Sequence, residues 1–130
     1  MKTERPAPGV TTRTAAFWEG GAVGELRIQR CQTCARWLHP PLPMCPQCHG
    51  RDLEPEVVSG RGTVWSYTVN HYRWSETLEP PYVVAEVELD EQADLRLLTV
   101  IVDCDDVAIG MPVRVRFEPA GDAWAPVFAP

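Results

Sequence analysis

Short stretches of alternating hydrophobic and polar residues dominate the second half of the chain. A period of two along the sequence is typical of β-strands that bury one face. Segments that alternate in this way, or that are apolar on both faces, predict strands over residues 62–71, 82–89, 95–102, 113–118 and 124–128. In the first strand, Thr63, Trp65, Tyr67 and Val69 are expected on one face.

Residues 105–110 predict one helical turn between the third and fourth strands, with Val107 and Ile109 partly buried. No segment there is long enough for the helical crossover that neighbouring parallel strands need, so an antiparallel sheet is expected. Five short strands in this order are typical of the OB-fold, a partly open Greek-key barrel. The predicted fold class is therefore mainly β, with the barrel over residues 59–130.

The first half of the chain has a different pattern. Residues 1–13 contain two prolines and a glycine without periodicity, which predicts a flexible arm. Residues 14–19 predict a short helix, capped by Thr12 or Thr14 and ended by Gly20-Gly21. The alternation around Leu26 and Ile28 predicts a strand, and residues 37–39 predict a returning strand. Residues 14–58 would therefore form a helix and a small ribbon.

Four cysteines lie in two C-x-x-C pairs separated by ten residues: Cys31, Cys34, Cys45 and Cys48. Each pair turns tightly enough to direct two sulfur atoms at one ion, and two pairs complete a tetrahedral shell of four thiolates. Such a shell favours one structural zinc ion, although iron is held by the same geometry in rubredoxin. Because the protein fills all four positions, the site would be closed to water and substrate.

The remaining cysteine and the histidines carry weaker signals. Cys104 stands among acidic residues, where a catalytic nucleophile is not expected, so we predict a passive, packed side chain. His39, between Leu38 and a proline, is expected to pack locally, and His49 follows the last cysteine. The sequence shows no recognisable catalytic frame, so an enzyme is not expected.

Charge is distributed unevenly along the chain. Residues 1–51 carry seven basic and three acidic side chains, a net +4, whereas residues 52–130 carry five basic and fifteen acidic, a net −10. Single-stranded nucleic acid, which some OB-folds bind, requires basic surfaces, so the acidic barrel argues against this partner. The chain lacks the ~20-residue apolar run of a membrane span and an apolar leader, so we expect a cytoplasmic protein.

Two groups of residues are candidates for contact with a ligand or a partner. His71, Arg73 and Trp74 flank the loop after the first barrel strand, where OB-folds commonly hold ligands. Arg36 and Trp37 follow the first cysteine pair. Exposed aromatic side chains often dominate protein interfaces, and we expect Trp37 and Trp74 to be of this kind.

Taken together, residues 14–130 resemble a family of acyl-CoA-associated proteins, long catalogued as a domain of unknown function. The family combines an N-terminal rubredoxin-like zinc ribbon with a C-terminal OB-fold. The matching motifs are Phe17-Trp18, Gly24-Glu25-Leu26, Arg30–Cys34, Pro40-Pro41, Cys45–Cys48, Ser59–Val64, Ser66-Tyr67-Thr68, Pro81–Val84, Ile109–Val113 and Pro126-Val127-Phe128.

The resemblance implies a non-catalytic accessory subunit that stabilises a thiolase-fold enzyme acting on acyl-CoA thioesters. Such partners include lipid-transfer-type thiolases and the aldolases that cleave steroid side chains. Basic residues of the first half, such as Arg27, Arg30, Arg36 and Arg51, are candidates to meet CoA phosphates or an acidic partner. A free-standing acyl-CoA-binding module is the alternative, and a single-stranded nucleic-acid binder is a more distant one.

Overall fold

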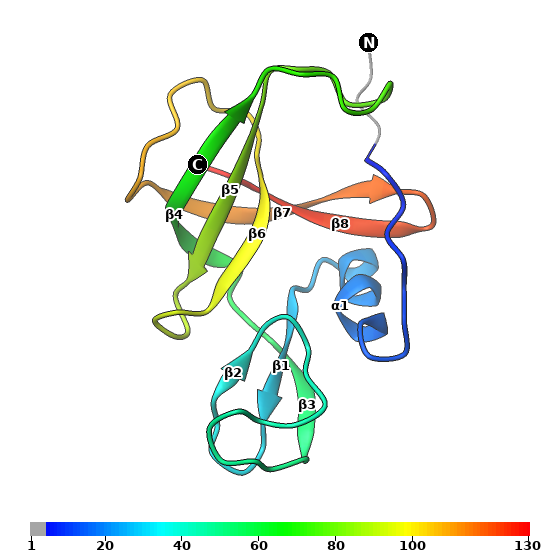
Figure 1. Ribbon diagram of the computed structural model, residues 1–130, viewed down its shortest axis with the longest axis vertical. Coiled ribbons are helices and arrows are strands. Elements are labelled where there is room, and N and C mark those ends of the chain that lie inside the picture. Colours follow the sequence, from blue (N-terminus) through cyan, green and yellow to red (C-terminus); the bar gives the residue numbers. More distant parts are fainter. Residues whose placement is uncertain (1–4) are drawn as a thin grey trace.

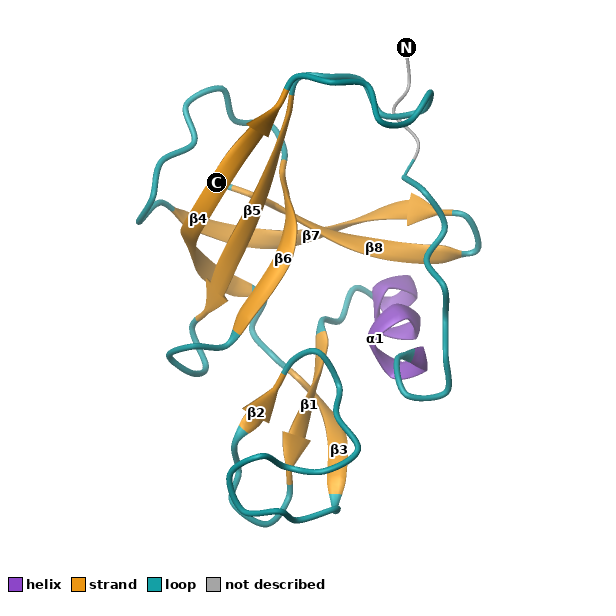
Figure 2. Ribbon diagram, in the orientation of Figure 1, coloured by secondary structure: helices purple, strands orange, loops and turns teal. Residues whose placement is uncertain are grey.

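The computed structural model of the protein describes residues 5–130, which form a small zinc-ribbon-like sheet beneath a closed β-barrel (Figure 1). The helix α1 (Ala15–Gly20) leads into the 3-10 turn η1 (Gly21–Val23). The ribbon follows, with β1 (Arg27–Cys31), β2 (Trp37–Leu38) and β3 (Leu53–Val57) in the antiparallel order β2-β1-β3. In Figure 2, α1 lies beside the ribbon and below the barrel.

The barrel consists of β4 (Arg61–Asn70), β5 (Tyr82–Leu89), β6 (Arg96–Ile101), β7 (Pro112–Ala120) and β8 (Ala123–Ala129). Its closed order is β4-β5-β6-β8-β7, the Greek-key arrangement of an OB-fold. The strands pair antiparallel except at one place, where Ile101 of β6 pairs with Phe128 of β8 in parallel. The expectation of a purely antiparallel sheet was wrong there, because closing the barrel brings two strands of the same direction together.

The five barrel strands confirm the sequence prediction, while three local predictions were wrong. Residues 105–110 form turns and no helix, because the backbone of Gly110 and Met111 pairs instead with Val64 of β4. Ile109 is correspondingly 70% exposed. The expected face of β4 is interrupted by a β-bulge between Val64 and Ser66.

The N-terminal segment also departs from its pattern in detail. Thr14 is the N-cap residue of α1, but its side chain makes no capping hydrogen bond and instead accepts one from the Thr11 N–H at 2.9 Å. The α-helix ends at Gly20 with Gly21 as its C-cap, as predicted. The separate 3-10 turn η1 follows and ends at Gly24, whose φ of 74° is left-handed. Residues 5–13 form no helix or regular strand, and Arg5 is paired with Glu118 at 2.9 Å.

One hydrophobic core joins the barrel to the ribbon. Fully buried barrel residues such as Val64, Val87 and Phe128 belong to the same cluster as Leu26 and Ile28, which lead into and lie on β1. The ribbon's distal half has only a small separate cluster around its cysteines, which includes Leu38 and Leu53. The ribbon is therefore anchored at its base and depends on the cysteines at its tip. Among the residues described, no helix is long and apolar enough to cross a membrane.

Candidate functional site

The four cysteines of the two C-x-x-C pairs converge at the tip of the ribbon, as the spacing predicted. Their Sγ atoms all lie within 4.8 Å of one another. The sulfur–sulfur distance is 3.6 Å between Cys31 and Cys48 and 3.7 Å between Cys34 and Cys45. Sulfurs at about 2.3 Å from a tetrahedral zinc ion are about 3.8 Å apart, so this spacing fits such an ion.

Backbone hydrogen bonds in each pair favour the charged form of its first cysteine. The backbone N–H of Cys34, assisted by that of Thr33, lowers the pKa of the Cys31 thiol to about 6 against the opposing effect of burial. The N–H groups of Cys48 and Gln47 likewise lower the pKa of Cys45. Hydrogen bonds to a thiolate favour ionisation, and the thiolate is the form that binds metal.

Cys48 shows why a cation belongs among these sulfurs. The Gly50 N–H lowers its pKa, but the hydrogen bond with Cys31, burial and the other two sulfurs outweigh this and raise the pKa to about 12. Four adjacent thiolates can be ionised together only beside a positive charge. The cluster therefore fits a divalent ion of the zinc type, and its four protein ligands leave no position for substrate. Cys104 is not part of the cluster; its thiol lies 3.4 Å from Asp106 Oδ1 and 3.9 Å from Met111 Sδ.

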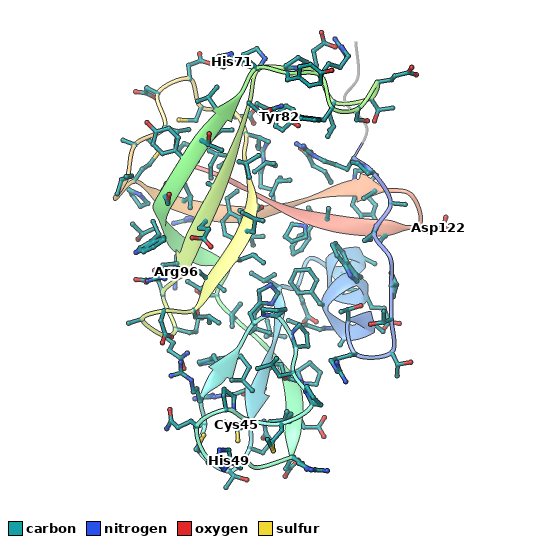
Figure 3. The ribbon with its side chains drawn as sticks, in the orientation of Figure 1. Cys45, His49, His71, Tyr82, Arg96 and Asp122 are labelled. Atoms are coloured by element: carbon teal, nitrogen blue, oxygen red, sulfur yellow. The ribbon has the colours of Figure 1, made fainter. Side chains whose placement is uncertain are left out.

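The other candidate residues lie far from the cysteines and fall into two groups. Figure 3 places His71 at one end of the long axis and Cys45 and His49 at the other. The loop with His71, Arg73 and Trp74 connects β4 to β5 at the barrel's far end. Arg36 and Trp37 lie between these ends, where the ribbon meets the barrel. The structure therefore does not bring the predicted contact residues together into one site.

Trp37 is not the exposed anchor that we expected, because only 8% of its surface is accessible. The side chain of Gln92, in the turn between β5 and β6, forms two hydrogen bonds with the backbone of Trp37. The Trp37 N–H donates to Gln92 Oε1 at 2.9 Å, and Gln92 Nε2 donates to the Trp37 carbonyl oxygen at 3.1 Å. The Arg30 guanidinium also lies over the indole ring, 4.5 Å from its centroid. Trp37 thus belongs to the junction of ribbon and barrel.

Arg36 strengthens the same junction. Its guanidinium forms an ion pair of 2.8 Å with Asp94, which holds the pKa of that carboxyl below its usual value. Two of the other basic residues named above are also paired within the chain, Arg27 with Glu25 and Arg30 with Glu56. These three guanidinium groups therefore already have carboxylate partners, which weakens the case that they meet CoA phosphates.

The β4–β5 loop presents the exposed aromatic surface that the sequence suggested. Trp74 is 73% exposed and its indole N–H donates to Asn70 Oδ1 at 2.8 Å. The ring of Tyr72 lies 4.6 Å from that of Trp74, and Arg73 pairs with Glu79 at 2.9 Å. Tyr72, which is 64% exposed, was not singled out from the sequence. These contacts hold the large side chains in place on the surface.

His39 packs locally, as predicted. Its ring stacks on Phe17 of α1 with 5.2 Å between centroids, and its buried Nδ1 has no hydrogen-bond partner. Burial lowers the pKa of the imidazole to about 4. His39 is therefore neutral at physiological pH and forms an uncharged wall between α1 and the barrel.

Comparison with known proteins gives this architecture a family. A model of the ChsH2 rubredoxin-like zinc ribbon domain matches residues 18–54, and one of the ChsH2 C-terminal OB-fold domain matches residues 56–118. A chain of the solved Ltp2–ChsH2(DUF35) aldolase is 39% identical, with a TM-score of 0.85, over 95% of this chain and 98% of that one.

Other relatives carry different names. The 3-oxo-4,17-pregnadiene-20-carboxyl-CoA hydratase alpha subunit of Mycobacterium tuberculosis is 39% identical over 92% of this chain. A DUF35 domain-containing scaffold protein of Methanocaldococcus jannaschii is 38% identical over 68% of this chain and 64% of its own length. The chain spans only about two fifths of the length of the hydratase subunits that it matches. The zinc ribbon, the OB-fold and these matches show that the chain belongs to the ChsH2/DUF35 family.

Proposed function

We propose that this chain is a non-catalytic accessory subunit that binds and stabilises a thiolase-fold enzyme acting on acyl-CoA thioesters. The observation that carries the proposal is its likeness, over nearly the whole of both chains, to a chain of the Ltp2–ChsH2(DUF35) aldolase. A relative named as a scaffold protein supports a structural role. In this role the ribbon holds one structural zinc ion.

The chemistry of the site supports a subunit without catalysis of its own. The cysteine cluster has four protein ligands and would expose no coordination position for Lewis-acid chemistry. The exposed loop residues Tyr72 and Trp74 have the character of interface anchors, because aromatic side chains contribute strongly where they become buried against a partner. We assign this loop to partner contact, and Arg36 and Trp37 to the internal junction.

The test separates stabilisation from catalysis. The partner enzyme is first identified by affinity purification with a tagged form of this chain. It is then produced with and without this chain, and its soluble yield and its turnover of CoA thioesters are measured. We expect the enzyme to be soluble and active only with this chain, and the purified chain alone to leave CoA thioesters unchanged. Cleavage or condensation of thioesters by the isolated chain would overturn the proposal.

A hydratase complex is the second candidate, because relatives with this architecture are hydratase alpha subunits. The match covers about two fifths of the length of each of these subunits. Association with a hydratase-fold partner and no thiolase-fold partner would favour this candidate. An isolated chain that binds acyl-CoA tightly without any partner would favour a free-standing binding module.

A further inference from the structure

The barrel is not evenly sealed around its circumference. Strands β6 and β8 are joined by a single parallel pairing at Ile101 and Phe128, and they diverge from there toward α1 (Figure 1). Farther along the seam, the Thr99 hydroxyl donates to the Pro126 carbonyl oxygen at 3.0 Å. The seam is therefore a place where the wall of the barrel opens between two strands.

A cavity of about 450 Å³ occupies this seam, which we call the seam cavity. This volume is in the range of small-molecule sites, which are usually apolar with few polar groups. Helix α1, the Pro40-Pro41 segment, the β4–β5 loop, β6 and β8 all contribute to it. Its hydrophobic lining includes Phe17, Trp18, Leu78, Leu97, Ala125 and Val127.

The walls of the seam cavity carry almost no free charge. His39 lines it as a neutral ring, and the Thr99 hydroxyl is satisfied by its bond to β8. Arg5 is the only cation among the described residues that line it, and Arg5 is already paired with Glu118. An anionic ligand would find no unpaired positive group among these residues.

An adjoining cavity shares Arg5 and Leu78 with the seam cavity, and it also offers no unpaired cation among its described lining residues. Its three lining carboxylates are each ion-paired: Glu118 with Arg5, Glu79 with Arg73, and Asp103 with Arg116. Polyanions such as CoA bind where cations are available for their phosphates. The surroundings of the seam cavity therefore do not suit the CoA part of a thioester.

We propose that the seam cavity binds the uncharged hydrocarbon body of an acyl substrate and that the CoA moiety lies outside it. The choice of an acyl substrate rests on the proposed function, whereas the choice of an uncharged, hydrophobic occupant rests on the cavity itself. Burying such a body removes apolar surface from water, and this drives binding without any charge contact.

The test uses the zinc-loaded chain and two probes, progesterone and free CoA. Progesterone is an uncharged 3-oxo steroid, related to the acyl group in the name of the mycobacterial relative. In a ¹H–¹⁵N NMR titration we expect saturable progesterone shifts of the backbone amides of residues 97–100, Ala125 and Val127. Millimolar CoA should neither cause these shifts nor compete with the steroid.

Matched variants locate the site. Ala125→Leu fills part of the seam cavity and should weaken progesterone binding at least tenfold. Ala123→Leu makes the same change two residues earlier on β8, beside a different cavity, and should leave binding within twofold. Leu98→Glu adds a charge at the rim of the seam cavity. Because Leu98 is 70% exposed, this variant should fold, and its progesterone binding should be weaker.

Three outcomes would overturn the proposal: no saturable progesterone binding, equal binding by wild type and the folded Leu98→Glu and Ala125→Leu variants, or displacement of the steroid by CoA. A chain that binds its partner enzyme yet fails these tests would refute the ligand site and leave the accessory role intact. A chain that binds progesterone at the seam but binds no enzyme would refute the accessory role and leave the ligand site intact.

Discussion

Replacement of Cys45 by serine should release the metal and unfold the tip of the ribbon while the barrel stays folded. Cys45 is fully buried, and its sulfur lies 3.7 Å from that of Cys34. A serine oxygen is a poorer ligand for a soft thiolate-preferring ion than the sulfur it replaces. The structure predicts a local effect because the barrel and the base of the ribbon share a core that does not include the four clustered cysteines.

The magnitude follows from how little else stabilises the tip. Among the residues that the structure describes, the cluster there contains, besides cysteines, Leu38 and the partly buried Leu53. Burying two such side chains contributes at most roughly 3–6 kcal/mol. Zinc binding contributes on the order of 10–16 kcal/mol in small ribbon and finger peptides, where it is folding free energy. The metal is thus the larger of the two contributions, and its loss should leave the segments around the two cysteine pairs, residues 31–35 and 42–52, without stable structure.

The assay combines zinc content by mass spectrometry with amide hydrogen exchange. We expect one zinc per wild-type chain, less than one in Cys45→Ser, and loss of protection over residues 31–35 and 42–52, with Trp37 and β4–β8 still protected. Cys104→Ser is the control. Because Cys104 lies outside the cluster, this variant should keep one zinc per chain. A Cys45→Ser protein with a full zinc equivalent and a protected ribbon would show that the ligand assignment is wrong.

Three further predictions address the junction, the buried histidine and the exposed loop. Gln92→Ala removes both hydrogen bonds to the Trp37 backbone and should lower the free energy of unfolding by about 1–3 kcal/mol in urea titrations, with zinc content unchanged. The pKa of His39 is lowered to about 4, below the unfolded value of about 6.5, so the folded protein binds fewer protons than the unfolded chain between these pH values. The free energy of unfolding should therefore fall by about 3 kcal/mol as pH decreases from 6.5 to 4. His39→Phe keeps a ring against Phe17, and its stability–pH curve should be flatter over that window by the same amount; an unchanged curve would contradict the assignment. Trp74→Ala should weaken partner binding by about 2 kcal/mol, or roughly 30-fold, with unfolding within about 0.5 kcal/mol of wild type; unaltered binding would exclude the loop as an anchor.

The features that the sequence predicted well are those encoded locally. Two C-x-x-C pairs place sulfurs by turn geometry alone, so the spacing was enough to predict the cluster of Cys31, Cys34, Cys45 and Cys48. The barrel strands were predictable because each buries one face and shows it as a period of two. The local packing of His39 was predictable from its position between Leu38 and a proline.

The features that the sequence concealed depend on distant residues. The burial of Trp37 depends on Gln92, 55 positions away, so its neighbours in sequence gave no sign of it. Strand β3 was not predicted because Leu53–Val57 includes Pro55 and lacks clear alternation; as an edge strand of the ribbon it can accommodate a proline. The helical pattern at residues 105–110 gave way to pairing of Gly110 and Met111 with Val64.

Affinity purification of the tagged, zinc-loaded chain from its native cell, with mass spectrometry and stoichiometry of what accompanies it, tests the central claim most directly. The account predicts a thiolase-fold enzyme in near-equimolar amount, retained through gel filtration and reduced by Trp74→Ala. A folded, zinc-containing chain that elutes alone, even when the cells are grown on a substrate degraded through acyl-CoA thioesters, would contradict the accessory-subunit role.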